Sequence, residues 1–287
     1  MKKKKNILIC PLEWGLGHSG RMIALAERLK ELNFNIIFGA GEKQLAFLRN
    51  EMPGCTYVSF PGFRPAYSGF LPQYLVILLQ IPLLIYHRIR EHLILNKLIR
   101  DMSIDILISD NRFGLWNKNI LTIYITHQPR IAFPHYFSFL ESTGAYFHGK
   151  IISRYSLCYI PDLPGDLNLT GRLSHGIKLP DNVRFIGILS RFGESDQLPD
   201  SPSQKNGMTT VILSGPEPQR SILEEKLTDI LIKQNHRAVI LGGKPHENTS
   251  KGISANITYY SHADRRTMQE IISGSDQIGR ASCRERV

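Results

Sequence analysis

The sequence predicts an α/β protein of two similar domains, and three observations support this. The chain has 287 residues, about twice the usual length of one domain, and 42% of them are hydrophobic. Short apolar runs alternate with stretches of helical periodicity, as in a parallel sheet whose faces are covered by helices. The same order of strand, loop, helix and strand begins again after a polar segment in the last third of the chain.

The first half holds the elements of one sheet. The apolar run NILIC, Asn6–Cys10, has the length of a buried strand, and apolar residues recur at helical spacing over Arg21–Leu32. A turn-rich segment, PLEWGLGHSG, joins the two. Further strands are predicted at Asn35–Phe38, Thr56–Phe60, Ile104–Ser109, Leu121–Thr126, Leu157–Ile160 and Val183–Ile186, with a helix at Gln44–Asn50.

A segment rich in Ser, Pro, Gly and charge, residues 192–207, separates the two halves. This composition is typical of an interdomain linker. We therefore expect an N-terminal domain over residues 1–191 and a partial C-terminal domain over residues 208–276. In the second domain, strands are predicted at Thr209–Leu213, Ala238–Leu241 and Ile257–Tyr260, and helices at Ser221–Lys233 and Arg265–Ser273.

The last eleven residues, Gln277–Val287, break the amphipathic period of the stretch before them. Their sequence, QIGRASCRERV, matches in order the translation of a common short-read sequencing adapter. We therefore expect this segment to be non-native and leave it out of the predicted fold. The expectation that follows is that the authentic protein continues beyond Asp276.

The net charge is +10, of which two charges lie in this last segment and four in Lys2–Lys5. Such a balance is typical of proteins that bind nucleic acid, an anionic membrane surface or a phosphorylated ligand. The sequence has no aromatic–basic RNA motif and no zinc finger, so we expect no nucleic-acid partner. The four cysteines have neither metal-ligand nor CxxC spacing, which predicts no metal site, no disulfide framework and a reducing, cytoplasmic location.

The segment Leu71–Tyr86 is unusually apolar and contains LVILLQIPLLIY. The run is too short to span a bilayer, and the first apolar run of the chain is too short for a signal peptide. Two interpretations remain open. The segment is either a packed helix kinked near Pro82, or an apolar patch that touches the membrane beside Arg88, Arg90 and His92.

The segment GLGHSG, Gly15–Gly20, matches the dinucleotide pattern G-x-G-x-x-G. In a dinucleotide site the first glycine directly follows the strand, and an acidic residue follows the second strand. Here four residues separate Cys10 from Gly15, and Gly-Ala-Gly follows the second predicted strand. We therefore expect no nicotinamide or flavin cofactor. The motif instead places His18 between a strand and a helix, where an imidazole can take a proton from a hydroxyl or can merely cap the helix.

The segment WGLGHSGRMIALAERL resembles the motif G-x-G-H-x-x-R of a bacterial family of predicted glycosyltransferases. This family, similar to glycosyltransferase family 28, is related to the enzyme that adds N-acetylglucosamine to lipid-linked muropeptide. Segments resembling the family's further signatures follow in order: ISDNRFGLW, YITHQ, CYIPDLPGDLNLTGRLSH, FIGILSRF, ILSGPEPQR and GGKP. The resemblance covers Asn6 to Asp276. It implies the GT-B fold, with two Rossmann-like domains facing across a cleft, the second incomplete here and carrying most of the contacts to a nucleotide-sugar donor.

The resemblance implies roles for residues of the first domain. His18 matches the histidine of the motif and is a candidate catalytic base, with Glu13 as the other candidate. Candidate acceptor contacts lie in the motif and at the carboxyl ends of predicted strands, where open α/β sheets bind ligands. They are Gly15, Gly17, Arg21, Asp110, Asn111, Arg112, His127 and Gln128. An internal salt bridge between Asp110 and Arg112, and a purely structural His127, are alternatives that stay open.

In the second domain, the loop after the first predicted strand is the candidate donor site. Gly215 allows close approach of the backbone, N–H groups at the start of a helix suit a diphosphate, and Arg220 adds positive charge. A plain strand–helix turn is the alternative. The candidate donor-binding residues are Ser214, Gly215, Glu217, Gln219, Arg220, Gly243 and Lys244.

The sequence thus predicts a glycosyltransferase that moves a sugar from a nucleotide-sugar, such as a UDP-sugar, to an envelope or lipid-linked acceptor. We expect direct displacement at the anomeric carbon without a bound metal, because no D-x-D sequence is present. We expect the protein to act at the inner face of the cell membrane. Two alternatives stay open: a nucleotide-sugar 2-epimerase of the same fold, or an inactive acceptor- or membrane-binding fragment, since relatives hold the donor phosphate with a segment that follows the position of Asp276.

Overall fold

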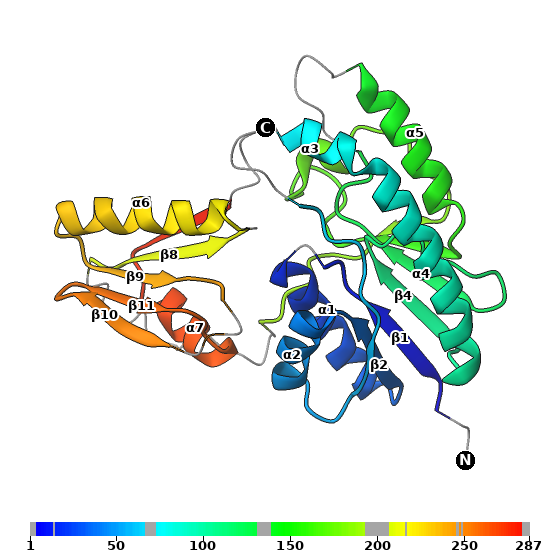
Figure 1. Ribbon diagram of the computed structural model, residues 1–287, viewed down its shortest axis with the longest axis horizontal. Coiled ribbons are helices and arrows are strands. Elements are labelled where there is room, and N and C mark those ends of the chain that lie inside the picture. The colour runs from blue at the N-terminus through cyan, green and yellow to red at the C-terminus, as the bar shows by residue number, and fades with distance from the viewer. Residues whose placement is uncertain are drawn as a thin grey trace.

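The computed structural model describes residues 4–13, 15–66, 73–130, 139–192, 207–215, 217–244, 247 and 249–282. Within these residues the chain forms two α/β domains, each built on one sheet (Figure 1). Residues 193–206 of the predicted linker lie outside the described residues. Leu71, at the start of the apolar segment, and residues 283–287, at the end of the chain, also lie outside the described residues.

The first domain contains a parallel sheet whose described strands follow the order β3-β2-β1-β4-β5-β6-β7. The order reverses between β1 and β4, which pair directly, with Ile7 opposite Ile106. Ligands of open α/β sheets bind outside the carboxyl ends of the strands at such a reversal. The strands are β1 (Asn6–Cys10), β2 (Asn35–Ala40), β3 (Thr56–Ser59), β4 (Ile106–Asp110), β5 (Leu121–Ile125), β6 (Leu157–Ile160) and β7 (Val183–Phe185).

Helices cover both faces of this sheet. Ile7 and Ile9 of β1 belong to the buried cluster that includes α1 (Leu16–Glu31) and α2 (Glu42–Glu51). Leu8 of β1 belongs to the opposite cluster, with α4 (Ile81–Asp101). Because successive strand residues point to opposite faces, a strand covered on both sides is apolar throughout, as NILIC is. The domain also contains α5 (Leu140–Ile152) and the short 3-10 helix η2 (Gly171–Leu173).

The second domain contains a sheet in the order β10-β11-β9-β8-β12. The helix α6 (Gln219–Lys233) packs on one face through Leu231, and α7 (Arg265–Ser273) packs on the other through Met268. One strand, β10 (Ser250–Ser254), is antiparallel to its neighbour and was not predicted. The other strands are β8 (Thr209–Ser214), β9 (Ala238–Leu241), β11 (Ile257–Tyr260) and β12 (Gln277–Ser282).

Strand β12 is made of residues that the sequence analysis left out of the fold. It pairs in parallel with β8 over its whole length, from Gln277 opposite Thr209 to Ser282 opposite Ser214. Backbone groups make a sheet ladder, so this pairing does not depend on the identity of the side chains. The sheet therefore has an edge strand that was not predicted, and the non-native origin of Gln277–Val287 stays a prediction.

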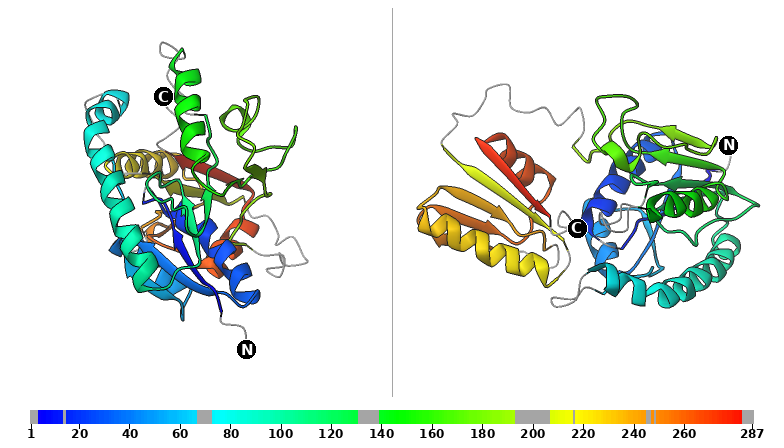
Figure 2. Two further views of the ribbon diagram at one scale, coloured as in Figure 1. Left: turned by 90° about the vertical axis from the view of Figure 1, so that its right-hand side faces the viewer. Right: turned by 90° about the horizontal axis from the view of Figure 1, so that it is seen from above.

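The apolar segment forms two helices along the outside of the first domain, α3 (Gln73–Leu79) and α4 (Figures 1 and 2). The break between them falls at Gln80, two residues before Pro82, near which a kink was predicted. Pro82 lies in the first turn of α4, where a missing N–H costs no hydrogen bond. Among the described helices, none is both long and apolar enough to cross a membrane.

The two domains touch through α1 and α2 on one side and α7 with its preceding loop on the other. Arg265 Nη2 donates to Glu27 Oε2 at 2.9 Å, and the rings of Phe47 and His262 meet edge to face with centroids 5.9 Å apart. Strand β8 points toward the first domain in both views (Figures 1 and 2). The carboxyl end of β8 therefore faces the domain that carries α1.

Candidate functional site

The candidate site begins at the carboxyl end of β1. Helix α1 starts at Leu16, earlier than predicted, so His18 lies in its first turn. A Cβ added to Gly15 or Gly17 meets nothing within 4 Å in the described part of the chain, and both glycines are exposed. The packing of the chain therefore does not demand these glycines, and their bare backbone leaves room for a ligand.

Asp110, the last residue of β4, is fully buried at the centre of a polar cluster. Its Oδ2 accepts hydrogen bonds from His18 Nδ1 at 2.9 Å and from Arg21 Nε at 3.1 Å, and its Oδ1 pairs with Arg21 Nη2. His18 and Arg21 are three residues apart in α1 and so share one face of the helix. Asp110 therefore pairs with α1, and the alternative of a salt bridge between Asp110 and Arg112 is wrong.

Asp110 and Arg21 both lie within hydrogen-bond distance of His18 Nδ1. Burial alone raises the pKa of Asp110, but the Arg21 guanidinium and the His18 ring outweigh it and bring the pKa to about 2. An ionised carboxylate only accepts and a guanidinium only donates, so Nδ1 carries its proton when it bonds to Asp110 and its lone pair when it accepts from Arg21 Nη2, which lies 2.7 Å away. With the proton on Nδ1, His18 carries its lone pair on Nε2 and can take a proton there, and the carboxylate stabilises the imidazolium that forms.

His127, just after β5, joins the same cluster. Its Nδ1 lies 3.1 Å from Arg21 Nη1, and its ring centroid is 5.7 Å from that of His18. Because a guanidinium only donates, His127 Nδ1 accepts this bond. Gln128 is half-buried, and its backbone N–H donates to Thr126 Oγ1 at 3.2 Å. Asp110, His18, Arg21 and His127 thus form one unit, which we call the Asp110 cluster.

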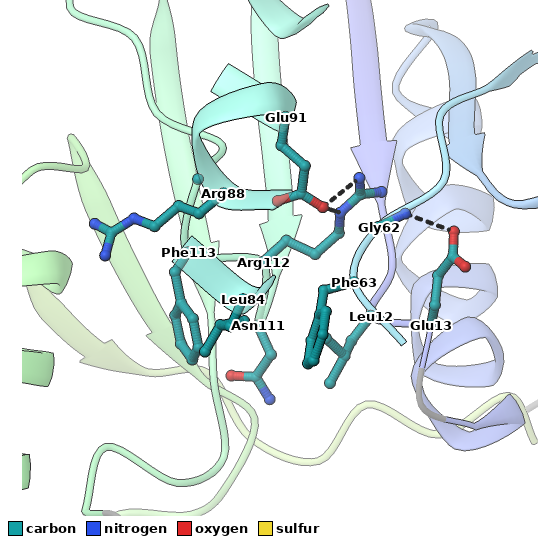
Figure 3. Close-up of a pocket in the computed structure, with 11 residues that line it drawn as sticks. Leu12, Glu13, Gly62, Phe63, Leu84, Arg88, Glu91, Asn111, Arg112 and Phe113 are labelled. Atoms are coloured by element: carbon teal, nitrogen blue, oxygen red, sulfur yellow. Dashed lines mark hydrogen bonds and ion pairs between the residues drawn. The ribbon is translucent and has the colours of Figure 1, made fainter. Parts of the chain in front are cut away.

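Glu13, the second candidate base, is engaged in holding a neighbouring loop. Its Oε1 accepts from the backbone N–H of Gly62 at 2.9 Å (Figure 3), and its Oε2 pairs with Arg64. Both carboxylate oxygens therefore have partners from the segment after β3. Of the two candidate bases, the geometry favours His18.

Arg112 is 3% exposed and lies beneath the site. Its Nε and Nη2 donate to Glu91 Oε1 of α4 at 3.0 and 2.8 Å (Figure 3). Its Nη1 donates to the backbone carbonyls of Gly39 and Phe60. The donors of Arg112 are therefore turned toward the interior of the domain, where they tie α4 to β2 and β3. Sequence reasoning missed Glu91, although a lone acidic residue on the inward face of an apolar helix is a usable signal.

Asn111 lies between Asp110 and Arg112 in the chain and separates the Asp110 cluster from the pair of Arg112 and Glu91. It has a left-handed backbone, φ 53°, a conformation that Asn tolerates better than most residues. Its side chain is 5% exposed, and its Oδ1 accepts from the Tyr124 hydroxyl at 3.2 Å. The chain turns at Asn111, so Asp110 faces α1 and Arg112 faces α4.

The predicted donor residues lie at the carboxyl ends of β8 and β9, which are neighbours in the second sheet. Ser214 ends β8, and Gly215 follows with φ 135°. Gly243, with φ 66°, follows β9. It lies so close to β8 that an added Cβ would be 2.6 Å from the Leu213 carbonyl oxygen. The two loops are therefore adjacent, and Gln219 begins α6 beside them.

The guanidinium of Arg220 is already paired within its own domain. It is 3% exposed, and its guanidinium donates to Glu217 Oε1 at 2.8 Å, Glu224 Oε2 at 2.6 Å and the Gly242 carbonyl at 3.0 Å. Burial raises the pKa of Glu217, but the hydrogen bond from Arg220 outweighs it and lowers that pKa. Lys244 is partly exposed, with Nζ 3.8 Å from Glu224 Oε1. Arg220 therefore links the loops after β8 and β9, and Lys244 is the more accessible cation.

Among the described residues, no group of three or more His, Cys, Asp or Glu side chains is placed to hold a metal ion. No protein-family model and no curated protein sequence matches the chain.

Solved structures show what fold the chain has. The kitacinnamycin glycotransferase gives a TM-score of 0.58 at 11% identity, over 97% of this chain and 76% of that chain. The calicheamicin glycosyltransferase gives 0.55 at 9% identity, over 97% and 74%. A glycosyltransferase of Streptomyces sp. SF2575, solved with thymidine diphosphate, gives 0.50 at 13% identity, over 96% and 76%. The chain therefore has the GT-B fold, as the motif resemblance implied.

Proposed function

We propose that this chain transfers a sugar from a nucleoside-diphosphate donor to a hydroxyl of an acceptor, with His18 as the catalytic base. The observation that carries the proposal is the pair of His18 and Asp110 at the point where the sheet order reverses. The bare backbone of Gly15 and Gly17 leaves room beside it. The fold supports the proposal, since the solved structures that share it include glycosyltransferases.

The chemistry requires one proton transfer and one displacement. The acceptor hydroxyl gives its proton to His18 Nε2 while its oxygen forms a bond to the anomeric carbon. The bond from that carbon to the diphosphate oxygen breaks, and the nucleoside diphosphate leaves with the electron pair. Asp110 accepts the Nδ1–H of His18 throughout, and Arg21 keeps Asp110 ionised. The net positive charge that forms on His18 is thus stabilised inside the Asp110 cluster.

For the donor we propose the loops after β8 and β9. Gly215 exposes backbone between β8 and α6, and the start of α6 carries N–H groups and the positive end of its dipole. Lys244 supplies a cation beside them, and Arg220 keeps the two loops together through Glu217 and the Gly242 carbonyl. The thymidine diphosphate held by the Streptomyces glycosyltransferase of this fold supports a nucleoside diphosphate as the leaving group. A UDP-sugar is the donor we propose.

For the acceptor we propose an envelope or lipid-linked molecule, reached by peripheral contact with the inner face of the cell membrane. Helices α3 and α4 carry large apolar side chains that are more than half exposed, and Arg90 lies among them, also exposed. Apolar side chains with a neighbouring cation suit the interface of an anionic membrane. The exposed apolar residues are Leu78, Leu79, Ile85, Tyr86, Ile89 and Leu93, which we call the α3–α4 patch.

A donor and acceptor screen tests the proposed function. The chain is incubated with UDP-N-acetylglucosamine, UDP-glucose or TDP-glucose, with and without a lipid extract of bacterial envelopes. We expect release of nucleoside diphosphate only with the extract, together with a lipid that gains the mass of one sugar. Release or an epimerised sugar without extract would indicate a 2-epimerase. No release with any donor, with vesicle binding retained, would reduce the chain to a binding protein.

A further inference from the structure

A groove lies on the first domain, between α5 and residues 177–180, which lead into β7. Its volume is about 620 Å³, within the usual range of small-molecule sites. Helix α5 lies in the half of the first domain that is away from the second domain (Figures 1 and 2). The groove, which we call the α5 groove, shares no lining residue with the Asp110 cluster or with the loops after β8 and β9. It is therefore separate from both parts of the proposed reaction.

Three cations line the α5 groove, and each comes from a different segment of the chain. Arg130 follows β5, Lys150 lies in the last turn of α5, and Lys178 precedes β7. Arg130 Nη2 donates to the Gly176 carbonyl oxygen at 3.3 Å, and Lys150 Nζ lies 4.6 Å from the Tyr146 ring centroid. Within the described part of the chain, none of the three cations pairs with a carboxylate. Their charges are therefore open to a ligand.

The α5 groove has one acidic residue among its described lining residues, Glu141, and it is already paired. Glu141 Oε2 lies 3.6 Å from Arg172 Nη2, and the Glu141 side chain is 17% exposed. Other cations of this domain have carboxylate partners, namely Arg21, Arg64 and Arg112. The α5 groove thus keeps a net positive charge that its own residues do not compensate. Such a concave site attracts an anion.

Gly149 keeps the α5 groove open from the side of the helix. A Cβ added there would lie 3.9 Å from Pro180 Cγ, an ordinary contact, so packing does not demand a glycine. A glycine inside a helix costs about 1 kcal/mol relative to alanine. A larger side chain at this position would enter the groove, because Gly149 and Pro180 both line it. The glycine therefore preserves the groove at a cost to the stability of α5.

The walls and the charge together favour a phosphate ester. A phosphate monoester has nearly two negative charges and three terminal oxygens at neutral pH, which suits three cations better than the single charge of a carboxylate does. The groove also has apolar walls, from Ala145, Ile177 and Leu179, that suit an organic part. We propose that the α5 groove binds a small soluble phosphate monoester, whose phosphate contacts Arg130, Lys150 and Lys178. This binding does not depend on the proposed sugar transfer.

Phosphate esters and their parent alcohols test the proposal by binding alone. In isothermal titration, glycerol 3-phosphate or glucose 6-phosphate should bind at least about tenfold more tightly than glycerol or glucose. The double variant Lys150→Gln with Lys178→Gln should weaken this binding at least about tenfold. Gly149→Leu fills the groove without a change of charge and should weaken it as much. The control, Lys43→Gln with Lys118→Gln, removes two exposed cations of the same domain and should stay within about twofold of the wild type.

Esters that bind no better than their parent alcohols would overturn the proposal. So would binding that survives in both groove variants, or that falls equally in the control. The two groove variants act through charge and through shape, so misfolding of one leaves the other as the test, and circular dichroism measures the folding of each.

Competition and vesicles separate the sources of the phosphate group. UDP should not displace the bound ester, because the proposed donor loops lie in the other domain; displacement would place the ester at those loops. Vesicles of phosphatidylcholine with phosphatidic acid offer the same phosphate monoester on a lipid. Binding to these vesicles but to neither soluble ester, lost in the groove variants, would assign the groove to a lipid headgroup and contradict the soluble ligand. No turnover is needed, so failure of the proposed transfer leaves these results readable.

Discussion

Asp110 is a buried carboxylate that stays ionised because Arg21 and His18 of α1 both hydrogen-bond to it. Arg21 and His18 reach it from successive turns of one helix, and Arg21 also contacts His127. The cluster therefore couples the ends of β4 and β5 to the first turn of α1. This arrangement fixes the ring of His18 before any ligand binds, which is the condition for an efficient proton acceptor.

Asp110→Asn should remove stability that depends on pH. The folded-state pKa of Asp110 is about 2, below its ordinary value of 3.8. A lowered pKa stabilises the fold above about pH 4, and this contribution is lost as the pH falls toward about 2. It amounts to about 2 kcal/mol at neutral pH. Urea unfolding should show this loss in the wild type and in the exposed control Asp229→Asn, but not in Asp110→Asn; equal pH profiles for all three proteins would contradict the account.

The motif in the sequence identified His18 and Arg21, but the partner of Asp110 could not be predicted from it. The alternatives were an ion pair with Arg112 and a contact to a ligand. The choice is made by the left-handed turn at Asn111, which sends Asp110 toward α1 and Arg112 toward Glu91. Local sequence does not specify that turn, because Asn also adopts ordinary backbone conformations.

At the scale of elements, α3 and α4 carry the largest group of exposed apolar side chains described above. Helix α4 is bound to its domain by Leu95 and Glu91, while Leu78 and Ile89 are 58% and 57% exposed. An apolar outer surface of this kind costs solubility unless it meets a membrane or a partner.

Glu substitution at both Leu78 and Ile89 should release the chain from vesicles of phosphatidylcholine and phosphatidylglycerol without unfolding it. Each exposed side chain contributes about 1.5 kcal/mol when it enters the interface, so the double variant should bind at least about tenfold more weakly. The matched control is Glu at Ile222 and Ile230 of α6, which are 45% and 48% exposed. Co-sedimentation measures binding and circular dichroism measures folding. Unchanged binding of the α3–α4 variant, or equal loss in the α6 control, would remove the patch as a membrane contact.

Most elements could be predicted to within a few residues, because strands covered on both faces are continuously apolar. Asn6–Cys10, Leu157–Ile160 and Ala238–Leu241 were predicted with the observed bounds. The start of α1 was not, since GLGHS contains poor helix formers and its first turn follows the loop geometry. The exposed edge strand β10 and the helix α5 were also missed, because polar or mixed side chains hide their periodicity.

At the scale of the whole molecule, each domain contributes one part of the proposed reaction. The proposed base lies at the carboxyl ends of β1 and β4, and the proposed donor loops lie at the carboxyl ends of β8 and β9. Among the described residues, contacts between the domains include Arg265 with Glu27 and His262 with Phe47.

The measurement that tests this division most directly compares His18→Ala with the wild type in nucleoside-diphosphate release and in nucleoside-diphosphate binding. The rate should fall by about 10²- to 10⁴-fold, while the dissociation constant stays within about twofold, because His18 and the donor loops lie in different domains. His236→Ala, which loses a contact to Thr209 at the far end of β8, should keep both values. An unchanged rate in His18→Ala, or lost binding in place of a lost rate, would contradict the assignment of His18 as the base.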